Sequence, residues 1–494
     1  MEISFYDTYT AQKIDFKSRD KGKVYMYVCG LTPSNYPHVG HARTAVIFDV
    51  IRRIFEKNGY VVHYYSNFTD IDDKIIQKSI DEKVTTEEVA RKYSEAYLHA
   101  MDQLHIKPLE KWARVTENIP EIIEMVAKLI ERGFAYESDG DVYFRVKKFS
   151  SYGKLSKRSI KEMLVGARIS PGEKKEDPLD FALWKAAKPG EPSWSSPWGK
   201  GRPGWHIECS AMSLKYLGNH FDIHGGAQDL IFPHHENEIA QAEAYTGISP
   251  FSRYWIHTGW VTLNREKMSK SIGNVFLISE ALKVVAPNVL RFFFVETLYS
   301  SPLEYNLDQL HQASRVFERI VITMQRLEEA IHRAKTGPID EKILRGFERL
   351  HDSFHQALAQ NFNTPQGIAV IMNAVRELNK LLDTTSLALE DLKTIQHYFE
   401  DWFETLGLVD VATTELSKDE WDLMAELKAL ASHHHIELSD STTLPEMIHA
   451  FIQKRERFRQ NKQYFESDTI RNDLYALKIQ LEDKKEGTEY RTIP

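Results

Sequence analysis

Strand-like and helix-like segments alternate at the start of the chain. Lys23–Val28 and Tyr60–Tyr65 are rich in residues that favour strands. Between them, residues 42–57 carry apolar side chains at the spacing of one helix face and are followed by Asn58-Gly59, a typical helix stop. This order predicts a strand-helix-strand unit that opens a Rossmann-like, doubly wound α/β domain. Ligands of such domains bind beyond the carboxyl ends of the strands.

The pattern then becomes less regular for about a hundred residues. A capping box at Thr85 predicts a helix to about Leu104, and a second helix is expected from Pro120 to Gly133. A hairpin is expected around residues 138–140, and from there to Gly204 the many prolines and glycines indicate loops. We therefore predict that a connective domain is inserted into the α/β domain here.

The second half of the chain changes from strands to helices. Two strand regions, 220–226 and 254–263, would complete the parallel sheet. Helices are then expected near 308–334, 338–359, 365–383, 388–405 and 417–432, and residues 444–483 hold two more helices and a charged tail.

These patterns divide the chain into an α/β domain, an all-α bundle and a small C-terminal domain. The expected boundaries are 1–109 (α/β domain, first half), 110–202 (connective insertion), 203–264 (α/β domain, second half), 265–307 (loop and connecting segment), 308–408 (helical bundle) and 409–494 (small C-terminal domain).

Length and composition are typical of a globular protein with several domains. The chain has 494 residues, more than one hydrophobic core usually organises, and 42% of them are hydrophobic. No uninterrupted apolar run approaches the roughly 18 residues of a membrane span, and the first residues lack the layout of a secretion signal. We expect a cytoplasmic protein, without membrane partners and by default a monomer.

Four residues far apart in sequence are candidate metal ligands. Cys29 and Cys209 are the only cysteines. His234 and Glu238 stand at i and i+4 of a helical pattern that begins at Pro233, so they share one helix face. Two thiolates, an imidazole and a carboxylate suit zinc. The alternatives are buried cysteines that only fill the core, or a zinc ion that only braces the fold.

Two short motifs, Pro37-His38-Val39-Gly40-His41 and Lys267-Met268-Ser269-Lys270-Ser271, follow one another on this α/β background. Together they resemble the ATP motifs of the class I aminoacyl-tRNA synthetases. Residues 67–74, 177–185, 204–210 and 232–238 look like those of the cysteinyl-tRNA synthetases, and the similarity covers essentially the whole chain. Two departures are residues 31–35, next to the first cysteine, and Tyr490, where that family usually has tryptophan.

The resemblance implies a ligase that uses ATP and Mg²⁺ to convert L-cysteine to cysteinyl-adenylate and transfers it to the 3′-terminal adenosine of tRNA(Cys). It implies catalytic roles for His38, His41, Lys267 and Lys270, and an ATP site that also includes Gly40, Gly226 and Asp229. It implies a cysteine pocket of Cys29, Thr69, Trp205 and His224, one zinc ion per chain on Cys29, Cys209, His234 and Glu238, and tRNA contacts at Arg455, Arg457, Arg459 and Arg471.

The chemistry of the ATP motifs agrees with these roles. Histidines at a helix N-terminus can donate hydrogen bonds to phosphate oxygens, and the helix end adds a partial positive charge. Lysines on a closing loop can neutralise the pyrophosphate that leaves. Taken alone, His38 to His41 could equally be a turn that caps a helix, and Lys267 and Lys270 a solvated pair. The other pocket residues could equally be packed aromatics or turn residues.

A zinc site has a direct use in selecting cysteine. A thiol bound to zinc is held as thiolate, a contact that the serine hydroxyl reproduces poorly. Discrimination through such a missing contact reaches ~10⁴–10⁵, so no editing domain is expected. We expect Glu238 to leave the metal when cysteine binds. His206 and His235 are tempting as further ligands, but His235 points about 100° around the helix from His234, so we expect it to be a packing or supporting histidine.

The net charge of −8 argues against RNA binding through global charge, so a local basic face is needed. Residues 454–462 are rich in lysine and arginine, which is either a solvated helix face or a contact for tRNA phosphates; the resemblance favours the contact.

Two other functions remain open. A ligase that joins activated cysteine to an amino sugar in mycothiol synthesis shares the catalytic half, but the long helical region 308–494 argues against it. A regulator that binds RNA or nucleotide without catalysis would be expected to carry damaged ATP motifs or a damaged metal quartet, and both are intact.

Overall fold

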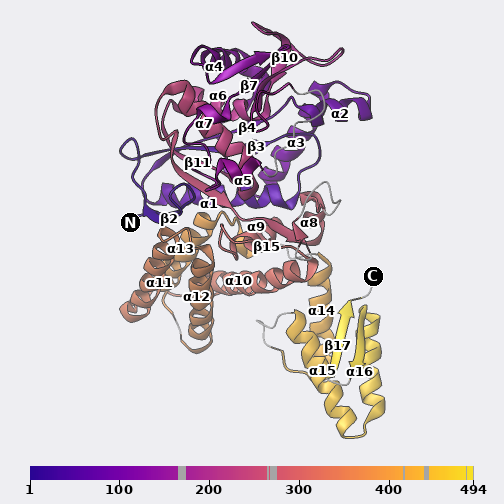
Figure 1. The fold of residues 1–494 in the computed structure, drawn as a ribbon. Coiled ribbons are helices and arrows are strands. Elements are labelled where there is room, and N and C mark those ends of the chain that lie inside the picture. The colour runs from indigo at the N-terminus through magenta and orange to yellow at the C-terminus, as the bar shows by residue number, and fades with distance from the viewer. Residues whose placement is uncertain are drawn as a thin grey trace.

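The chain folds into an α/β part, a helical bundle and a small C-terminal part that follow one another in space as in sequence (Figure 1). The computed structural model describes residues 1–164, 174–263, 266–267, 275–385, 387–414, 418–438, 444–484 and 487–492.

A five-stranded parallel sheet forms the centre of the α/β part. Its strand order is β12-β11-β3-β4-β5, and every neighbouring pair is parallel. The bounds are β3 Lys23–Leu31, β4 Val61–Phe68, β5 Lys111–Arg114, β11 Phe221–Ala227 and β12 Ser252–Thr258. The predicted Rossmann-like, doubly wound fold is confirmed.

Strand β3 separates two hydrophobic cores because its side chains alternate between the faces of the sheet. Met26 and Val28 pack into the core that includes helix α1, Val39–Lys57. Tyr27 and Cys29 face the other core, which is covered by helices α6, Trp205–Leu217, and α7, Glu236–Thr246. The thiol of Cys29 therefore lies at the carboxyl end of a central strand, on the side of α6 and α7.

The inserted segment contains its own five-stranded sheet, in the order β6-β7-β8-β10-β9. The expected hairpin forms from β6 and β7, but the region expected to be loops contains three further strands. Their backbone hydrogen bonds need partners across the sheet, which local proline and glycine content does not reveal. The bounds are β6 Ala135–Ser138, β7 Asp141–Phe144, β8 Phe181–Ala186, β9 Trp194–Ser196 and β10 Gly199–Pro203.

The insertion also begins later than expected. Strand β5 pairs with β4 in the central sheet, so the insertion starts after Arg114 and not at Glu110. Helix α3, Thr86–Gln103, begins at the capping box of Thr85 as predicted, and α4, Ile119–Glu131, enters next to Pro120. The other elements of this half are β1 Ser4–Asp7, β2 Gln12–Asp15, α2 Asp73–Glu82, α5 Ile160–Leu164, β13 Val261–Leu263, β14 Glu266–Lys267 and β15 Leu303–Glu304.

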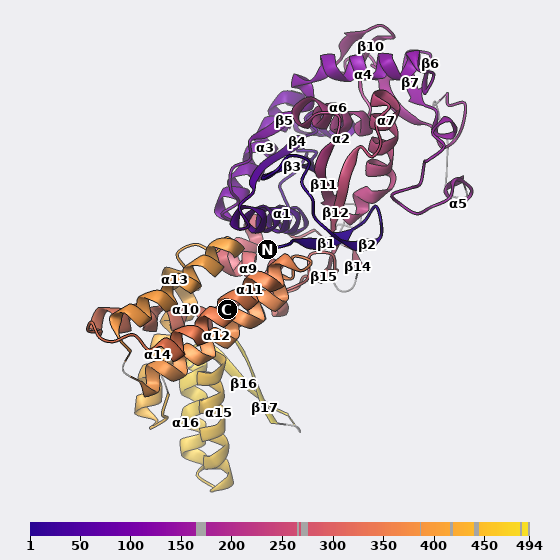
Figure 2. The same cartoon turned by 90° about the vertical axis from the view of Figure 1, so that its left-hand side faces the viewer.

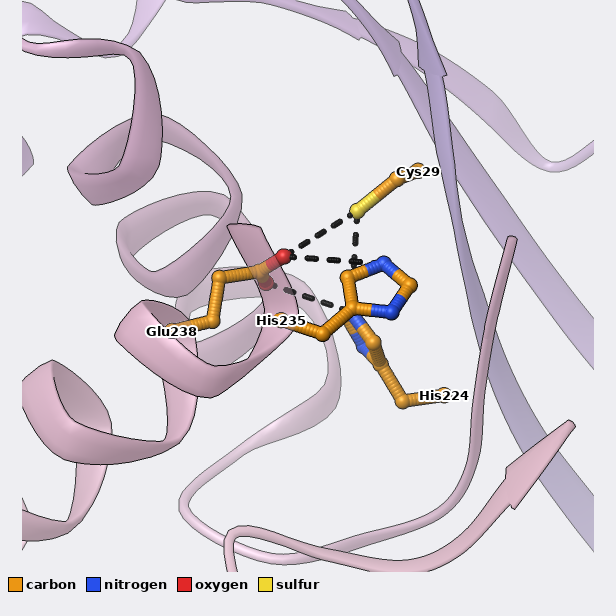
Figure 3. Close-up of side chains that lie close together, drawn as sticks. All are labelled: Cys29, His224, His235 and Glu238. Atoms are coloured by element: carbon orange, nitrogen blue, oxygen red, sulfur yellow. Dashed lines mark hydrogen bonds and ion pairs between the residues drawn. The ribbon is translucent and has the colours of Figure 1, made fainter. Parts of the chain in front are cut away.

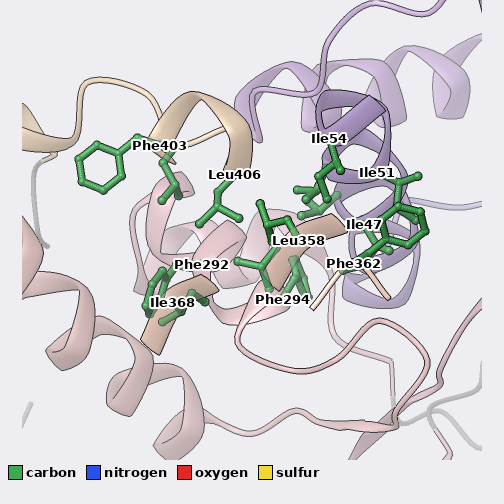
Figure 4. Close-up of a cluster of buried hydrophobic side chains, with 14 of the residues drawn as sticks. Ile47, Ile51, Ile54, Phe292, Phe294, Leu358, Phe362, Ile368, Phe403 and Leu406 are labelled. Atoms are coloured by element: carbon green, nitrogen blue, oxygen red, sulfur yellow. The ribbon is translucent and has the colours of Figure 1, made fainter. Parts of the chain in front are cut away.

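Four long helices form the bundle, at the positions that periodicity predicted. They are α10 Leu307–Arg333, α11 Glu341–Ala359, α12 Thr364–Thr384 and α13 Leu389–Leu406. Two short helices, α8 Ile278–Val284 and α9 Pro287–Val295, join the bundle to the sheet. Isoleucines of α1 and phenylalanines of α9 pack with residues of α11, α12 and α13, so one core continues from the α/β part into the bundle (Figure 4).

The C-terminal part consists of helices and a hairpin (Figure 2). It has a hydrophobic core of its own. It contains α14 Lys418–His433, α15 Leu444–Gln460, α16 Tyr464–Ala476, β16 Ile479–Lys484 and β17 Gly487–Thr492. The expected charged tail is therefore mostly an antiparallel hairpin. Over the described parts of the chain, no helix is long and apolar enough to cross a membrane.

Candidate functional site

A cavity of about 890 Å³ opens at the carboxyl ends of β3 and β4. Cys29, Cys209 and His234 line it from the side of α6 and α7. His38 and His41 line it from the N-terminus of α1. The two predicted kinds of chemistry, thiol binding and phosphate binding, thus share one cavity.

The four predicted metal ligands come together, and three of them, Cys29, Cys209 and His234, line this cavity. The Cys29 thiol lies 3.2 Å from Glu238 Oε1 and 3.5 Å from His234 Nε2, and these two atoms of His234 and Glu238 are 3.0 Å apart. Cys209 completes a group whose donor atoms all lie within 4.8 Å of one another, and all four residues are buried. Tetrahedral zinc with bonds of about 2.0–2.3 Å requires neighbouring donors roughly 3.3–3.8 Å apart. The residues therefore fit a zinc ion.

A second group of possible ligands overlaps the first. Cys29 and Glu238 also stand beside His224 and His235, as Figure 3 shows. His224 Nε2 lies 3.1 Å from Glu238 Oε2, and His235 Nε2 lies 3.8 Å from Glu238 Oε1. The i, i+3 spacing of His235 and Glu238 was a sequence signal for part of this group, whereas nothing in the sequence placed His224 against the same carboxylate.

Supporting histidines surround the cluster. Nδ1 of His206 lies 3.0 Å from Nδ1 of His234, which sets the orientation of the His234 ring. Nδ1 of His235 lies 2.8 Å from Nε2 of His257, whose own Nδ1 is 2.8 Å from the Thr8 hydroxyl. These contacts agree with the supporting role expected for His235 and suit a similar role for His206.

Burial and neighbouring charge shift the ionisation of the cluster. Burial favours the neutral form of Glu238, but the imidazoles of His224 and His234 outweigh it and hold the pKa of Glu238 well below its ordinary value. Burial opposes the charged form of His234 as well, yet the Glu238 carboxylate raises the pKa of His234 to about 10. Burial raises the pKa of the Cys29 thiol well above its ordinary value. The Glu238 carboxylate and the His234 imidazole thus each favour the charged form of the other.

The first ATP motif forms the N-terminus of α1, as predicted. His38 is the N-cap, its backbone N–H points to His41 Nδ1 at 3.3 Å, and the two rings stack with centroids 3.6 Å apart. The backbone hydrogen bond from Val39 to Phe276 is 3.0 Å long, and that from Ile278 to Pro37 is 3.1 Å long. These two bonds hold the segment that follows the second motif against the first.

The second motif is only partly within the described residues. The backbone of Lys267 ends strand β14, which pairs with β13, while the Lys267 side chain and all of Lys270 lie outside what the structure describes. Of the other expected ATP residues, Gly40 and Asp229 line the cavity. Gly226 is not among the lining residues: a Cβ there would lie 2.9 Å from Leu230 Cδ1 and 3.0 Å from His235 Cε1, so this glycine lets His235 approach the strand.

The residues expected to form the cysteine pocket do not all line the cavity either. Thr69 and Trp205 line the cavity, and the Trp205 ring lies 4.5 Å from that of His234. His224 does not line it; it is fully buried and stacked on Tyr27. Glu208, for which the sequence carried no signal, is buried beside this pocket and accepts a 2.7 Å hydrogen bond from the Thr69 hydroxyl. Burial raises the pKa of Glu208 well above its ordinary value.

Known proteins that are similar to this chain are aminoacyl-tRNA synthetases. Residues 15–315 match the family model described as tRNA synthetases class I (C) catalytic domain, and residues 353–410 match the DALR domain. The cysteine–tRNA ligase of Carboxydothermus hydrogenoformans is 44% identical over 491 residues, which cover 99% of this chain and 100% of that protein. That of Thermococcus gammatolerans is 43% identical over 498 residues and covers 100% of both. The chain belongs to the cysteine–tRNA ligase family.

Solved structures of other class I synthetases share the fold. The methionyl-tRNA synthetase of Mycobacterium tuberculosis, in complex with methionyl-adenylate, aligns with a TM-score of 0.56 at 14% identity and covers 82% of this chain and 94% of that one. A leucyl-tRNA synthetase ternary complex from Agrobacterium radiobacter has a TM-score of 0.57 at 10% identity, with 81% of this chain and 86% of that chain covered.

The arginines expected to contact tRNA in this family member differ in exposure. Arg455 is 2% exposed, and its Nη1 and Nη2 donate to the two oxygens of Asp483 at 2.7 and 2.9 Å. Arg455 is therefore held inside the protein, and we assign it a structural role in place of the predicted contact. Arg459 also donates to Asp483 but is partly exposed, and Arg457 and Arg471 are exposed.

Proposed function

We propose that this protein activates L-cysteine with ATP and Mg²⁺ and transfers it to tRNA(Cys), with a zinc ion on Cys29, Cys209, His234 and Glu238 that binds the substrate thiolate. One observation carries the proposal: three of the four buried donors, Cys29, Cys209 and His234, line the same cavity as the N-terminus of α1. An amino acid whose thiol is held at the donors can thus present its carboxylate towards a nucleotide at the helix end.

Selectivity follows from the donors. A zinc ion bound there supplies a soft contact that a thiolate satisfies and a hydroxyl does not. The donors themselves are buried and come from β3, α6, the turn Ile231–His235 and α7, so their positions are set by the fold. Loss of such a contact gives discrimination of ~10⁴–10⁵, against ~10–200 for one methylene.

Glu238 is the ligand that we expect to leave the zinc when cysteine binds. Its Oε2 already lies 3.1 Å from His224 Nε2, so the carboxylate keeps a partner after it leaves the metal. Zinc absorption spectroscopy with and without cysteine tests this step, and an unchanged ligand set would contradict it.

The ATP site would use the N-terminus of α1. His38 and His41 can donate to phosphate oxygens while the helix end stabilises negative charge. Lys267 and Lys270 would add positive charge from a loop whose following segment is bonded to the start of α1.

The parts after residue 307 would bind tRNA. Arg457, Arg459 and Arg471 are at least partly exposed, and α16 also exposes Tyr464, Phe465 and Tyr475, with 61%, 83% and 58% of their surface accessible. Basic and aromatic side chains together suit unpaired RNA bases and their phosphates. We also propose the domain boundaries that the sequence predicts, except that the connective insertion starts after Arg114.

Pyrophosphate exchange with cysteine and with serine, on zinc-loaded and zinc-stripped protein, tests the proposal. We expect exchange that requires cysteine and is lost without zinc. Equal exchange with serine would make the metal cluster purely structural. No exchange from folded, zinc-loaded protein would favour a regulator without catalysis.

A further inference from the structure

A second group of side chains that could bind a metal ion lies in the helical bundle, on elements that contribute no residue to the cavity. His351 and His355 stand at i and i+4 on α11, and Asp401 faces them from α13. His355 Nε2 is 2.7 Å from Asp401 Oδ2, and His351 Nδ1 is 4.0 Å from the same oxygen. All three donor atoms lie within 4.8 Å of one another.

The surroundings of this group suit a metal ion with water as additional ligand. The side chains are 26%, 15% and 17% exposed, so they are fixed by packing but reached by solvent. Two imidazoles and a carboxylate prefer Zn²⁺, Ni²⁺ or Cu²⁺ to Mg²⁺ or Ca²⁺.

Two contacts compete with a metal ion, and neither blocks it. Lys57, the last residue of α1, lies 2.7 Å from Asp401 Oδ1. The carboxylate oxygen that faces the two histidines is Oδ2, which Lys57 does not bind. Lys57 also lies 2.6 Å from Glu404, which would neutralise it if Asp401 turned to a metal. The Trp402 indole donates to His351 Nδ1 at 3.1 Å, and this bond would be given up.

We propose that His351, His355 and Asp401 form a binding site for a divalent transition metal ion, separate from the cluster around Cys29. The ion would join α11 to α13 at the place where the bundle meets the end of α1. The site contains no thiolate, which distinguishes it chemically from the cluster in the cavity.

Calorimetric titration of the full-length, zinc-loaded protein with Ni²⁺ tests the proposal. We expect one equivalent of Ni²⁺ to bind. The absorption spectrum should show no sulfur-to-nickel charge-transfer band, because such a band would indicate that Ni²⁺ had exchanged into the cluster around Cys29. His355→Ala should weaken binding by more than about tenfold, because loss of a ligand costs at least as much as loss of a supporting residue. The matched control is His332→Ala, which removes an exposed histidine of α10.

Lys57→Gln is the second variant, since it leaves all three ligands in place. Removal of the competing ammonium should tighten Ni²⁺ binding several-fold. The proposal is overturned if the zinc-loaded protein binds no Ni²⁺, if His355→Ala binds it as tightly as the unchanged protein, or if His332→Ala weakens it equally.

Discussion

At the scale of single residues, two buried carboxyl groups near the cavity have partners inside the protein. Glu238 is shared by His224 and His234, and Glu208 accepts a hydrogen bond from Thr69. A buried carboxyl group without a donor costs considerably more than an ordinary hydrogen bond contributes. We therefore expect that the loss of one of these pairs lowers the stability of the protein and changes the geometry of the pocket.

Thr69→Val tests one such pair. The valine has nearly the shape of threonine but leaves Glu208 without its donor, so we expect the free energy of unfolding to fall by about 1–3 kcal/mol. Urea denaturation measures this loss, and Thr69→Ser, which keeps the hydroxyl, should remain close to the unchanged protein. Equal stability of the valine and serine variants would show that the hydrogen bond is unimportant.

At the scale of elements, two helices combine different tasks along their length. Helix α1 carries His38 and His41 at its first turn and Lys57, bound to α13, at its last. Helix α15 carries basic residues of which Arg455 faces inward to the hairpin and Arg457 faces solvent. The face on which a residue lies, more than its charge, decides its role.

Helix α16 is predicted to contact tRNA through its exposed face. Arg471→Gln should weaken tRNA binding and lower the salt dependence of binding by about one phosphate contact, and Tyr475→Ala should weaken binding without that change. Filter binding at several salt concentrations measures both. Arg91→Gln on α3, another exposed arginine, is the control and should have no effect.

The bond between Arg455 and Asp483 is predicted to hold α15 to β16. The hydrogen bond from Arg455 keeps the pKa of Asp483 well below its ordinary value. A lowered pKa in the folded state contributes stability above the unfolded pKa of about 3.9 and loses it as the pH falls. Asp483→Asn should therefore speed hydrogen exchange in α15 and β16 at pH 7, and the difference from the unchanged protein should shrink below about pH 4.

The control for this experiment is Glu341→Gln, which breaks an exposed pair with Arg345. Such pairs contribute little, so its exchange should stay unchanged. A difference for Asp483→Asn that is independent of pH would contradict the ionic origin of the effect.

At the scale of the whole molecule, one buried arginine joins the α/β part to the bundle. Arg291 of α9 is fully buried and forms an ion pair with Asp49 of α1. It also donates to the backbone carbonyls of Leu406, at 2.6 Å, and Leu104, at 2.8 Å. Gly407, with φ of +71°, makes room for it, because a Cβ there would lie 2.1 Å from Arg291 Nη2.

Breaking this pair is predicted to destabilise both parts together. Arg291→Met should lower the free energy of unfolding by about 3–5 kcal/mol, since it leaves Asp49 buried with less compensation. Arg345→Gln, an exposed control on α11, should cost less than about 1 kcal/mol. Denaturation followed by tryptophan fluorescence compares them, and a loss below about 1 kcal/mol for Arg291→Met would contradict the role given to this residue.

Local patterns in the sequence were sufficient for much of the fold. The helices of the bundle, the strand-helix-strand opening and the capping box at Thr85 follow from periodicity and from residues within a few positions of one another. The motif around His38 was likewise sufficient to predict that a helix begins there, because this signal also lies within a few residues. The four donors around Cys29 could be grouped because their chemistry is rare in this sequence, with its two cysteines.

Only the tertiary structure decided which partner each polar or strand residue has. It placed β5 in the central sheet, turned Arg455 inward to Asp483, buried His224 behind Glu238 and brought His351, His355 and Asp401 together. Each of these outcomes depends on a partner from another element of the chain. Periodicity and capping are set by neighbours along the chain, whereas burial and pairing are set by distances in space, which only the packed core defines.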